Sequence, residues 1–252
     1  YETHSVEVSV TRQACTHIWD EGVVTKEPTA TEKGEKTHTC TVCKATKTEE
    51  VAALGAPEAD TKTTSDDGKA TYKVTTSDLT NGTVAYVAPT NKKATKVTIP
   101  DTVVIDGVTY KVTAIEKNAF KNNKKLKTLK LGKNITSIGD KAFYKCTALT
   151  KVTIPDKVKT IGKQAFYGCK NLKTVTIGKN VSKIGSKAFY GCKKLKTLII
   201  KSKKLTTKKI GSKAFSKTPK SMTVKVPKKK YKSYKPMLIK RGVNKKAKFK
   251  KI

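Results

Sequence analysis

The sequence predicts an α/β repeat fold, a solenoid of stacked units with short parallel strands on its concave face, preceded by a small β-rich module. Three observations predict it. One phrase recurs with a period of 23 residues, a pair of apolar positions follows each copy, and charge changes near residue 70. A period of roughly 20–50 residues is typical of units that bury their apolar side only by stacking.

The recurring phrase is clearest in "IGDKAFYKCTAL", which returns as "IGKQAFYGCKNL" and "IGSKAFYGCKKL". Its phenylalanines stand 23 residues apart, and the last follows after 26: Phe120, Phe143, Phe166, Phe189 and Phe215. An isoleucine precedes each of them in step, at Ile115, Ile138, Ile161, Ile184 and Ile210. Four good units and one degraded unit exceed the ~3 that a stack needs. We expect these columns to form the core.

A short strand follows each phrase, in "TLKL", "KVTI", "TVTI" and "TLII". Apolar residues spaced by two lie on the same side of a strand and leave the positions between them exposed. We expect the exposed positions and the lysines beside them to form a binding strip: Lys127, Thr128, Lys130, Lys151, Thr153, Lys173, Thr174, Thr176, Lys196 and Thr197. The strip offers hydroxyls and positive charge without aromatic anchors, which suits anionic glycans. Threonine also favours exposed strand positions for its own sake, and that alternative stays open.

The flanks of the repeats read as caps for the open ends of the stack. Alternating apolar and polar residues over 71–115, with Asn81-Gly82 and Asp106-Gly107 as turns, predict a β-hairpin cap. At the other end "VKVP" is the expected last strand. A short helix follows in "KKYKSYKPMLIKRG", closed by Gly242, with Pro236 expected to kink or delay it.

The repeat pattern resembles a known family. Leu126, Leu129, Leu131 and Asn134 match L-x-x-L-x-L-x-x-N of a leucine-rich repeat. The added I-G-x-x-A-F-x-x-C phrase is similar to the BspA-like subclass of bacterial surface proteins, over residues 96–226. The resemblance implies an adhesin-like, secreted or cell-surface protein that binds host matrix proteins or other microbes.

The cysteines of the repeat form one column, Cys146, Cys169 and Cys192, with Asn123 in the first unit and Thr218 in the last. Stacked residues lie about 4.8 Å apart, and three cysteines cannot all pair. A linear array gives no tetrahedral cage for a metal. We therefore expect buried packing, with redox or metal chemistry as the alternative.

The N-terminal cysteines have a different spacing, with C-x-H and C-x-x-C separated by 22 residues. Two close pairs on separate turns can form the tetrahedral cage of zinc. The expected ligands are Cys15, His17, Cys40 and Cys43, with His38 able to replace His17. A Cys40–Cys43 or Cys15–Cys40 disulfide and free thiols are the alternatives, and Lys44 stands where a zinc knuckle usually has glycine.

This module also resembles, through Trp19, Asp20 and Gly22 among others, a short module of secreted Gram-positive proteins. The implied location is a Gram-positive type of surface or exterior. The expected organisation is a module at 1–54, a linker rich in Ala, Thr, Asp and Gly at 55–69, the capped solenoid at 70–226 and a basic cap at 227–252.

Charge separates the two parts. Lys and Arg number 55 against 19 acids, a net charge of +36; residues 1–69 hold 8 basic and 13 acidic side chains, which leaves 47 and 6 for residues 70–252. Such a field attracts polyanions, although lysines also serve solubility alone. Only two of the basic residues are arginines, which argues against bidentate readout and hence against sequence-specific nucleic-acid recognition.

An enzyme is not expected. The six acids after residue 70 are scattered, no histidine lies beyond His38, and no glycine-rich phosphate loop occurs. The sequence contains no apolar run of the ~18 residues that crossing a membrane requires, so membrane insertion is not expected. Because the chain opens with Tyr1, we expect a trimmed or mature fragment, for which a missing signal peptide says nothing about compartment.

The expected function is therefore a non-catalytic, monomeric surface or secreted binding scaffold. Its expected partners are anionic polysaccharides or host extracellular-matrix and cell-surface proteins, and no cofactor is expected beyond structural zinc in the first module. The alternative is a structural spacer or wall-associating module held by teichoic acid or other envelope polyanions.

Overall fold

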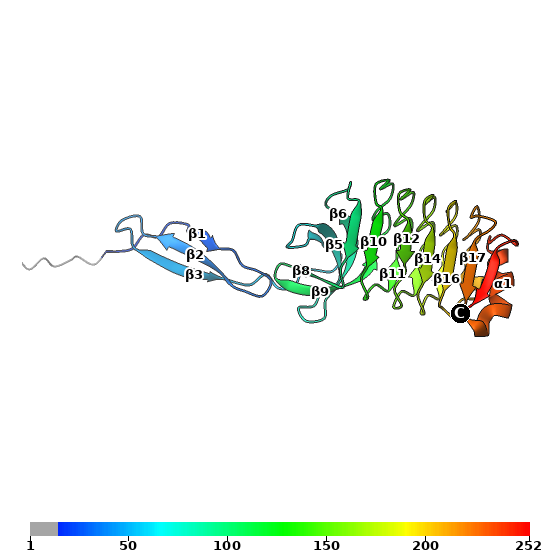
Figure 1. The fold of residues 1–252 in the computed structure, drawn as a ribbon. Helices are drawn as coiled ribbons and strands as arrows, with labels where there is room; N and C mark the ends of the chain where they lie inside the picture. The colour runs from blue at the N-terminus through cyan, green and yellow to red at the C-terminus, as the bar shows by residue number, and fades with distance from the viewer. Residues whose placement is uncertain (1–14) are drawn as a thin grey trace, which may run out of the picture. The chain divides into compact units, whose positions relative to one another are not determined.

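The computed structural model describes residues 15–252, and the chain divides into two compact units after Gly55 (Figure 1). Within the described residues, no helix has both the length and the apolar character that crossing a membrane requires.

The first unit is a three-stranded antiparallel sheet in the order β1-β2-β3, made of β1 (Val23–Lys26), β2 (Gly34–Thr39) and β3 (Thr46–Val51). Its strands are mostly exposed. Among residues 15–55, the only buried apolar side chains are Ala30 and Cys40. Burial of apolar surface therefore contributes little to the stability of this unit.

The second unit begins with hairpins, as the sequence predicts. The strands of this cap are β4 (Lys62–Thr64), β5 (Ala70–Thr76), β6 (Thr83–Pro89), β8 (Thr102–Ile105) and β9 (Val108–Ile115). The β8–β9 turn consists of Asp106 and Gly107, whose φ values of 50° and 77° are both positive, as a type I′ turn requires. The β5–β6 connection is a longer loop in which the Asp78 carboxylate accepts the backbone N–H groups of Thr80 and Asn81.

The expected linker over 55–69 differs in the structure. Its residues 62–64 form β4, which pairs antiparallel with β5, and the Ser65 hydroxyl is buried and donates to the Ala70 carbonyl oxygen. This segment therefore belongs to the cap of the second unit. Its strand carries no apolar alternation, so backbone pairing holds it in place.

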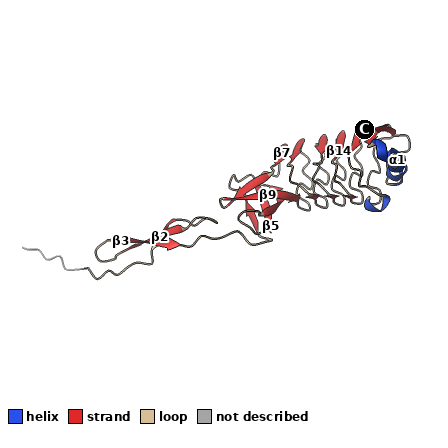
Figure 2. Cartoon of the chain, turned by 90° about the horizontal axis from the view of Figure 1, so that it is seen from below, coloured by secondary structure: helices blue, strands red, loops and turns tan. Residues whose placement is uncertain are grey.

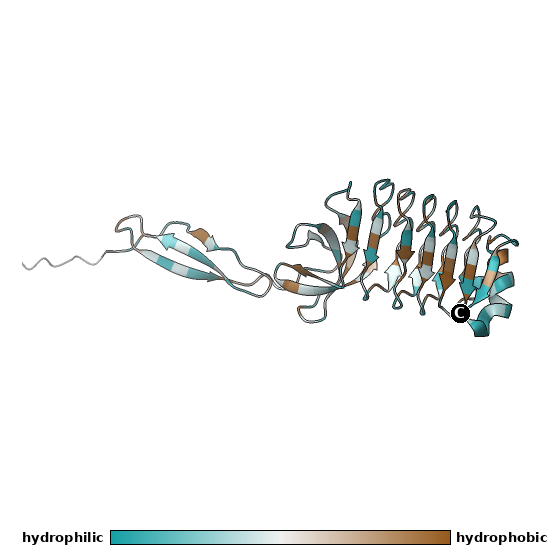
Figure 3. Cartoon of the chain, viewed as in Figure 1, coloured by the Kyte–Doolittle hydropathy of each residue, from teal (hydrophilic) through white to brown (hydrophobic). Residues whose placement is uncertain are grey.

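The repeat strands follow one another along the solenoid in two parallel sheets, β10-β7 and β12-β14-β16-β17-β18 (Figures 1 and 2). Corresponding residues pair, such as Val152 with Val175 and Val175 with Leu198. The strands are β7 (Lys96–Ile99), β10 (Thr128–Leu131), β12 (Lys151–Thr153), β14 (Thr174–Ile177), β16 (Thr197–Ile200), β17 (Thr223–Val226) and β18 (Lys248–Lys251). Hydrophobic and hydrophilic residues alternate along them (Figure 3), which confirms the predicted fold class.

A second parallel ladder runs beside the first. It continues β9 through the two-residue strands β11 (Ser137–Ile138), β13 (Thr160–Ile161) and β15 (Lys183–Ile184). The turn that follows each of these two-residue strands contains the repeat phenylalanine. Backbone hydrogen bonds link this turn to the equivalent turn of the next unit, as from Phe143 N to Ala165 O at 2.8 Å. The positive φ values of Lys141 and Lys145, 55° and 53°, prevent this turn from continuing as a helix.

The core is a continuous aromatic stack. Tyr86 and the five phenylalanines of the repeat lie ring on ring, with centroids 5.0–5.5 Å apart. All of these rings are buried. Each unit therefore buries its phenylalanine against its two neighbours.

The C-terminal cap contains a short helix as predicted, α1 (Tyr231–Lys240), with Pro236 inside it and Gly242 after it at φ 106°. Two 3₁₀ segments, η1 (Thr207–Lys209) and η2 (Lys228–Lys230), precede it. The expectation that "VKVP" ends the sheet is wrong, because β18 pairs in parallel with β17 beyond the helix. Its sequence, KFKK, is too charged to show the alternation of a strand.

Replacing Phe166 by Ala should lower the free energy of unfolding of the solenoid by about 3–5 kcal/mol, because a large cavity opens in the middle of the aromatic stack. Urea unfolding followed by far-UV circular dichroism measures this change. Phe166→Leu is the control and should cost clearly less. A loss below about 1 kcal/mol for Phe166→Ala would show that the stack does not carry the core.

Candidate functional site

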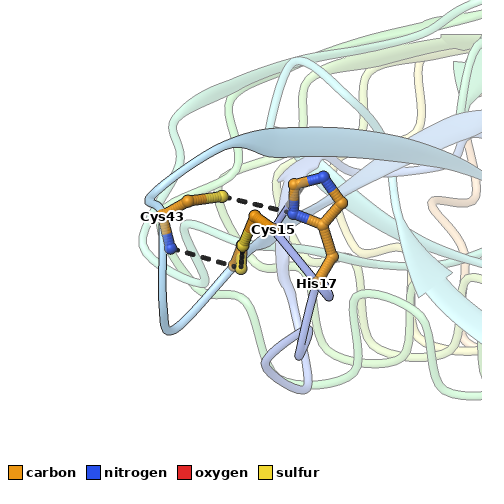
Figure 4. Close-up of side chains that lie close together, drawn as sticks. Cys15, His17 and Cys43 are labelled. Carbon is orange, nitrogen blue, oxygen red and sulfur yellow. Dashed lines mark hydrogen bonds between the residues drawn. The ribbon is translucent and has the colours of Figure 1, made fainter. Parts of the chain in front are cut away.

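The four predicted metal ligands of the first unit lie together, and Figure 4 shows three of them, Cys15, His17 and Cys43. The potential ligand atoms of Cys15, His17, Cys40 and Cys43 are all within 4.8 Å of one another. The Sγ atoms of Cys15 and Cys40 are 3.9 Å apart, and Cys43 Sγ lies 3.2 Å from His17 Nδ1. Three sulfurs and one imidazole nitrogen therefore converge on one small volume.

The backbone brings the two pairs together. Trp19 and Cys40 form an antiparallel bridge, and Thr41 N donates to Ile18 O at 2.8 Å. The C-x-x-C pair lies on the β2–β3 turn, which is closed by Cys40 N donating to Ala45 O at 2.7 Å. Lys44 adopts φ 61°, the left-handed conformation that favours glycine. A lysine thus takes the backbone shape for which a knuckle usually has glycine.

The hydrogen bonds of the cluster differentiate its thiols. The Cys43 N–H donates to Cys40 Sγ at 3.4 Å. This backbone N–H, with a smaller contribution from His17, lowers the pKa of Cys40 to about 5. The side-chain hydrogen bond with Cys43 raises the pKa of Cys15 to about 11. The cluster therefore combines a stabilised thiolate with a thiol that retains its proton beside it.

This donor set fits zinc. Zinc takes thiolate and imidazole ligands in a tetrahedron, and a structural site is closed by four protein ligands. A divalent cation would replace the protons that these thiols otherwise share. All six cysteines, which lie in the described part of the chain, are free thiols, and 3.9 Å between Cys15 and Cys40 exceeds the ~2.05 Å of an S–S bond.

His38 does not belong to the cluster, so the expectation that it could replace His17 is wrong. Its Nδ1 lies 2.9 Å from Asp20 O and its Nε2 lies 2.9 Å from Glu49 Oε2. Its ring packs against Gly22, where an added Cβ would come within 2.7 Å. His38 lies within β2, where both ring nitrogens already have partners, whereas Cys40 comes after the end of the strand, in the turn that faces Cys15.

The predicted binding strip occupies the strands of the solenoid, and we call it the strand face. Side-by-side pairing aligns Lys151 with Thr174 and Thr174 with Thr197. An open hollow of about 990 Å³ is lined by six predicted residues, Lys127, Thr128, Lys130, Lys151, Thr153 and Thr176. It does not include the other four, Lys173, Thr174, Lys196 and Thr197.

Sequence reasoning missed three further lysines of this hollow, Lys133, Lys157 and Lys201. They come just after β10, β12 and β16, in the turn that leaves each strand. The period gave no signal for them, because the next unit carries Asp156 in the column of Lys133 and Asn180 in that of Lys157. With them, six lysines line the hollow beside one carboxylate, that of Asp156.

Three carboxylates of the solenoid accept hydrogen bonds from backbone N–H groups in its turns. Asp140 accepts the backbone N–H of Lys163 at 2.7 Å, and Asp156 accepts that of Lys179 at 3.0 Å, each from the next unit. Asp101 accepts the Lys133 N–H in the same way. Because these carboxylates link successive turns, they are committed to structure and not paired for acid–base chemistry.

The repeat cysteines are buried, as predicted. Their thiols donate to phenylalanine carbonyl oxygens 26 residues earlier, at 3.1, 3.2 and 3.4 Å. Burial raises the pKa of Cys146 and of Cys192 to about 12, and raises that of Cys169 as well. In the first unit Asn123 stands in this column, and its side-chain amide donates to the backbone oxygen of Ala94 at 3.3 Å.

Parallel strands in 23-residue register, a phenylalanine stack and buried cysteines define a leucine-rich-repeat solenoid. The chain belongs to the BspA type leucine rich repeat family, whose model matches six copies over residues 109–236. No curated protein matches the chain. The predicted resemblance of the repeats is thus confirmed.

Two solved structures are similar. One is a leucine rich cell surface protein from Faecalibacterium prausnitzii A2-165, 29% identical with a TM-score of 0.53, covering 67% of this chain and 45% of that chain. The other is a Leucine Rich Repeat protein of T. pallidum, 22% identical with a TM-score of 0.50, covering 66% of this chain and 68% of that chain. This chain therefore spans less than half the length of the first, and the second shares its fold.

Iodoacetamide at pH 8 should leave Cys146, Cys169 and Cys192 unmodified in the folded protein. A pKa of about 12 leaves roughly one thiolate in ten thousand at that pH. Peptide mass spectrometry measures the modification, with the same reaction in urea as the positive control. Rapid labelling of these three cysteines without urea would contradict their place in the core.

Proposed function

We propose that the chain is a non-catalytic, adhesin-like binding scaffold, secreted or held at the cell surface, whose strand face engages anionic glycans. The observation that carries the proposal is the hollow lined by Lys127, Lys130 and Lys151 together with three lysines of the following turns. A net charge of +36 strengthens the attraction to polyanions at long range.

The chemistry of the strand face favours a glycan over a protein. Its hollow contains no aromatic side chain, whereas protein interfaces are anchored by buried aromatic residues and arginine. Lysine and threonine provide charge and hydroxyl contacts, which match the charged and hydroxyl groups of an anionic polysaccharide. A host extracellular-matrix or cell-surface protein is the second candidate, and a glycan carried by such a protein would satisfy both.

The proposed location rests on similarity. The protein from Faecalibacterium prausnitzii is described as a cell surface protein, and the first unit resembles modules of secreted Gram-positive proteins. The alternative function is a spacer or wall-associating module in which teichoic acid or another envelope polyanion holds the lysines. Both functions use the same charge, and they differ in which polymer binds more tightly.

We further propose that Cys15, His17, Cys40 and Cys43 hold a structural zinc ion. The support is the convergence of their ligand atoms within 4.8 Å and the near absence of an apolar core in the first unit. Small units without a core commonly rely on a metal for folding. The ion would take the place of that core and would fix the β2–β3 turn against the segment of Cys15.

Replacing Lys127, Lys130 and Lys151 by Gln should weaken heparin binding at physiological salt on the order of tenfold, because each exposed ion pair contributes about 0.2–1 kcal/mol. Calorimetric titration measures the affinity. The charge-matched control replaces Lys232, Lys235 and Lys240 of α1 and should change it less than about twofold.

Equal losses in both triple variants would contradict a dedicated strand face and leave charge alone as the cause. Competition between heparin and teichoic acid then separates adhesin from wall association. A preference for teichoic acid would support the alternative function.

Protein purified without chelator should contain one zinc ion per chain by elemental analysis. Chelation should shift the fluorescence of Trp19, the only tryptophan of the chain, whose ring lies 5.0 Å from that of His17. Far-UV circular dichroism of the solenoid should stay unchanged. Cys43→Ala should abolish zinc binding, whereas the control Cys169→Ala should retain it.

Less than about half an equivalent of zinc, together with an oxidised Cys40–Cys43 pair, would contradict the zinc proposal and support a disulfide. Cobalt offers an independent check, since Co²⁺ in a site with thiolates and one imidazole has strong sulfur-to-metal absorption.

A further inference from the structure

A second row of side chains lies in the turns that follow the phenylalanines. Tyr144, Tyr167 and Tyr190 have parallel rings, with centroids 5.0 and 5.1 Å apart and planes inclined by 11° and 6°. Backbone hydrogen bonds from Lys145 N to Tyr167 O and from Gly168 N to Tyr190 O, at 2.7 and 2.8 Å, set their spacing. All three side chains are half-buried. We call them the tyrosine row.

The fold does not require tyrosine at these places. The residue after the core phenylalanine is Lys121 in the first unit and Ser216 in the last, although both units keep the buried phenylalanine. The turn therefore forms equally well with other residues. Core packing therefore does not account for tyrosine in three consecutive units, which indicates a role at the surface.

Lysines close both ends of the row. Lys145 Nζ lies 5.3 Å from the Tyr144 ring centroid, and Lys217 Nζ lies 5.4 Å from that of Tyr190. These lysines occupy the column that holds Gly168 and Gly191 in the units between them. Their φ values of 53° and 57° are left-handed, a conformation that favours glycine. Both ends of the row thus carry a cation at a backbone position better suited to glycine.

Two members of the row, Tyr167 and Tyr190, line an open hollow of about 930 Å³, and Lys145, which follows Tyr144, lines it as well. No carboxylate is among the lining residues, all of which lie in the described chain, and five of them are lysines: Lys124, Lys145, Lys170, Lys193 and Lys217. None of them lines the hollow of the strand face. The tyrosine row is therefore a separate basic surface.

The orientation of the rings decides which polyanion fits. Each ring covers a face of its neighbour, so no face is free for a nucleic-acid base to stack on, as binding of single strands requires. Ring edges carry the positive side of the aromatic quadrupole, and the hydroxyls are hydrogen-bond donors. The Lys217 ammonium also lowers the pKa of the Tyr190 hydroxyl, which makes it a stronger donor. Edges, hydroxyls and ammonium groups all favour an anion.

The regular spacing along the solenoid favours a linear partner. One phenol recurs per unit, at a distance comparable to the length of one sugar in an extended polysaccharide. We propose that the tyrosine row and its lysines form a docking site for a linear sulfated or carboxylated polysaccharide that lies along the solenoid. This rests on the proposed binding of polyanions and assigns it a second, distinct surface.

The test uses the full chain and heparin at physiological salt. In the first variant Tyr144, Tyr167 and Tyr190 are replaced by Ser, the residue that the last unit carries in this column. It changes no charge at neutral pH, so non-specific attraction is preserved. Calorimetric titration should show at least tenfold weaker binding. In the second variant Lys145 and Lys217 become Gly, as in the neighbouring units, and binding should again weaken about tenfold.

The control Lys232→Gln with Lys235→Gln removes the same charge from α1 and should change the affinity less than twofold. Heparin should also protect Lys145 and Lys217 from acetylation, as read by peptide mass spectrometry. Unchanged thermal unfolding of the variants shows that they are folded.

The possible results are distinguishable. If the Ser variant binds heparin like the unmodified chain while loss of Lys127, Lys130 and Lys151 weakens binding, the tyrosine row is not a docking site and the strand face stands. If only the tyrosine row variants lose affinity, the present inference stands and the proposed role of the strand face falls. If the unmodified chain does not bind heparin at physiological salt, both are overturned.

Discussion

The second unit depends on stacking of chemically equivalent turns, because no single turn can bury its own apolar side. Stacking holds every column at the spacing of neighbouring strands. The phenylalanine rings, 5.0–5.5 Å apart, are its core. The thiol-to-carbonyl bonds of Cys146, Cys169 and Cys192 and the carboxylate bonds of Asp140 and Asp156 satisfy polar groups between the turns. A column that is not buried places its side chains next to one another on the surface, and both proposed binding surfaces consist of such columns.

The first unit has the opposite problem. Its sheet buries only Ala30 and Cys40 among the described apolar side chains, and a sheet of three short strands gains too little from that to order its turns. The three cysteines of the metal-ligand cluster therefore lie in the unit that has almost no apolar core. Lys44 adopts a left-handed φ of 61° in the turn that brings Cys40 and Cys43 together, although this conformation favours glycine. A conformational cost of this kind persists only where the surroundings determine it.

The sequence predicted best what a period can reveal. Columns of phenylalanine, isoleucine and cysteine specify burial, and the positions of Cys15, His17, Cys40 and Cys43 specify a cluster, because both depend on residue type at fixed spacing. It failed where pairing is made by backbone alone, as in β4 and β18, whose charged or threonine-rich strands carry no alternation. It also failed for His38, because ligand type without its turn geometry does not show where the imidazole points. The tyrosine row escaped notice because its column breaks at Lys121 and Ser216.

Charge and repetition reinforce each other in this chain. The few carboxylates after residue 70 are largely spent on linking turns, as Asp101, Asp140 and Asp156 do, so they neutralise little of the lysine charge. Repetition then places the remaining lysines in rows, and the mutual repulsion within a row costs stability that the buried aromatic stack must offset. A linear polyanion would relieve this repulsion along several units at once, since its charges recur as the lysines do. The proposed binding of an extended anionic polymer would therefore draw on the same charge and repetition that make the solenoid self-repulsive.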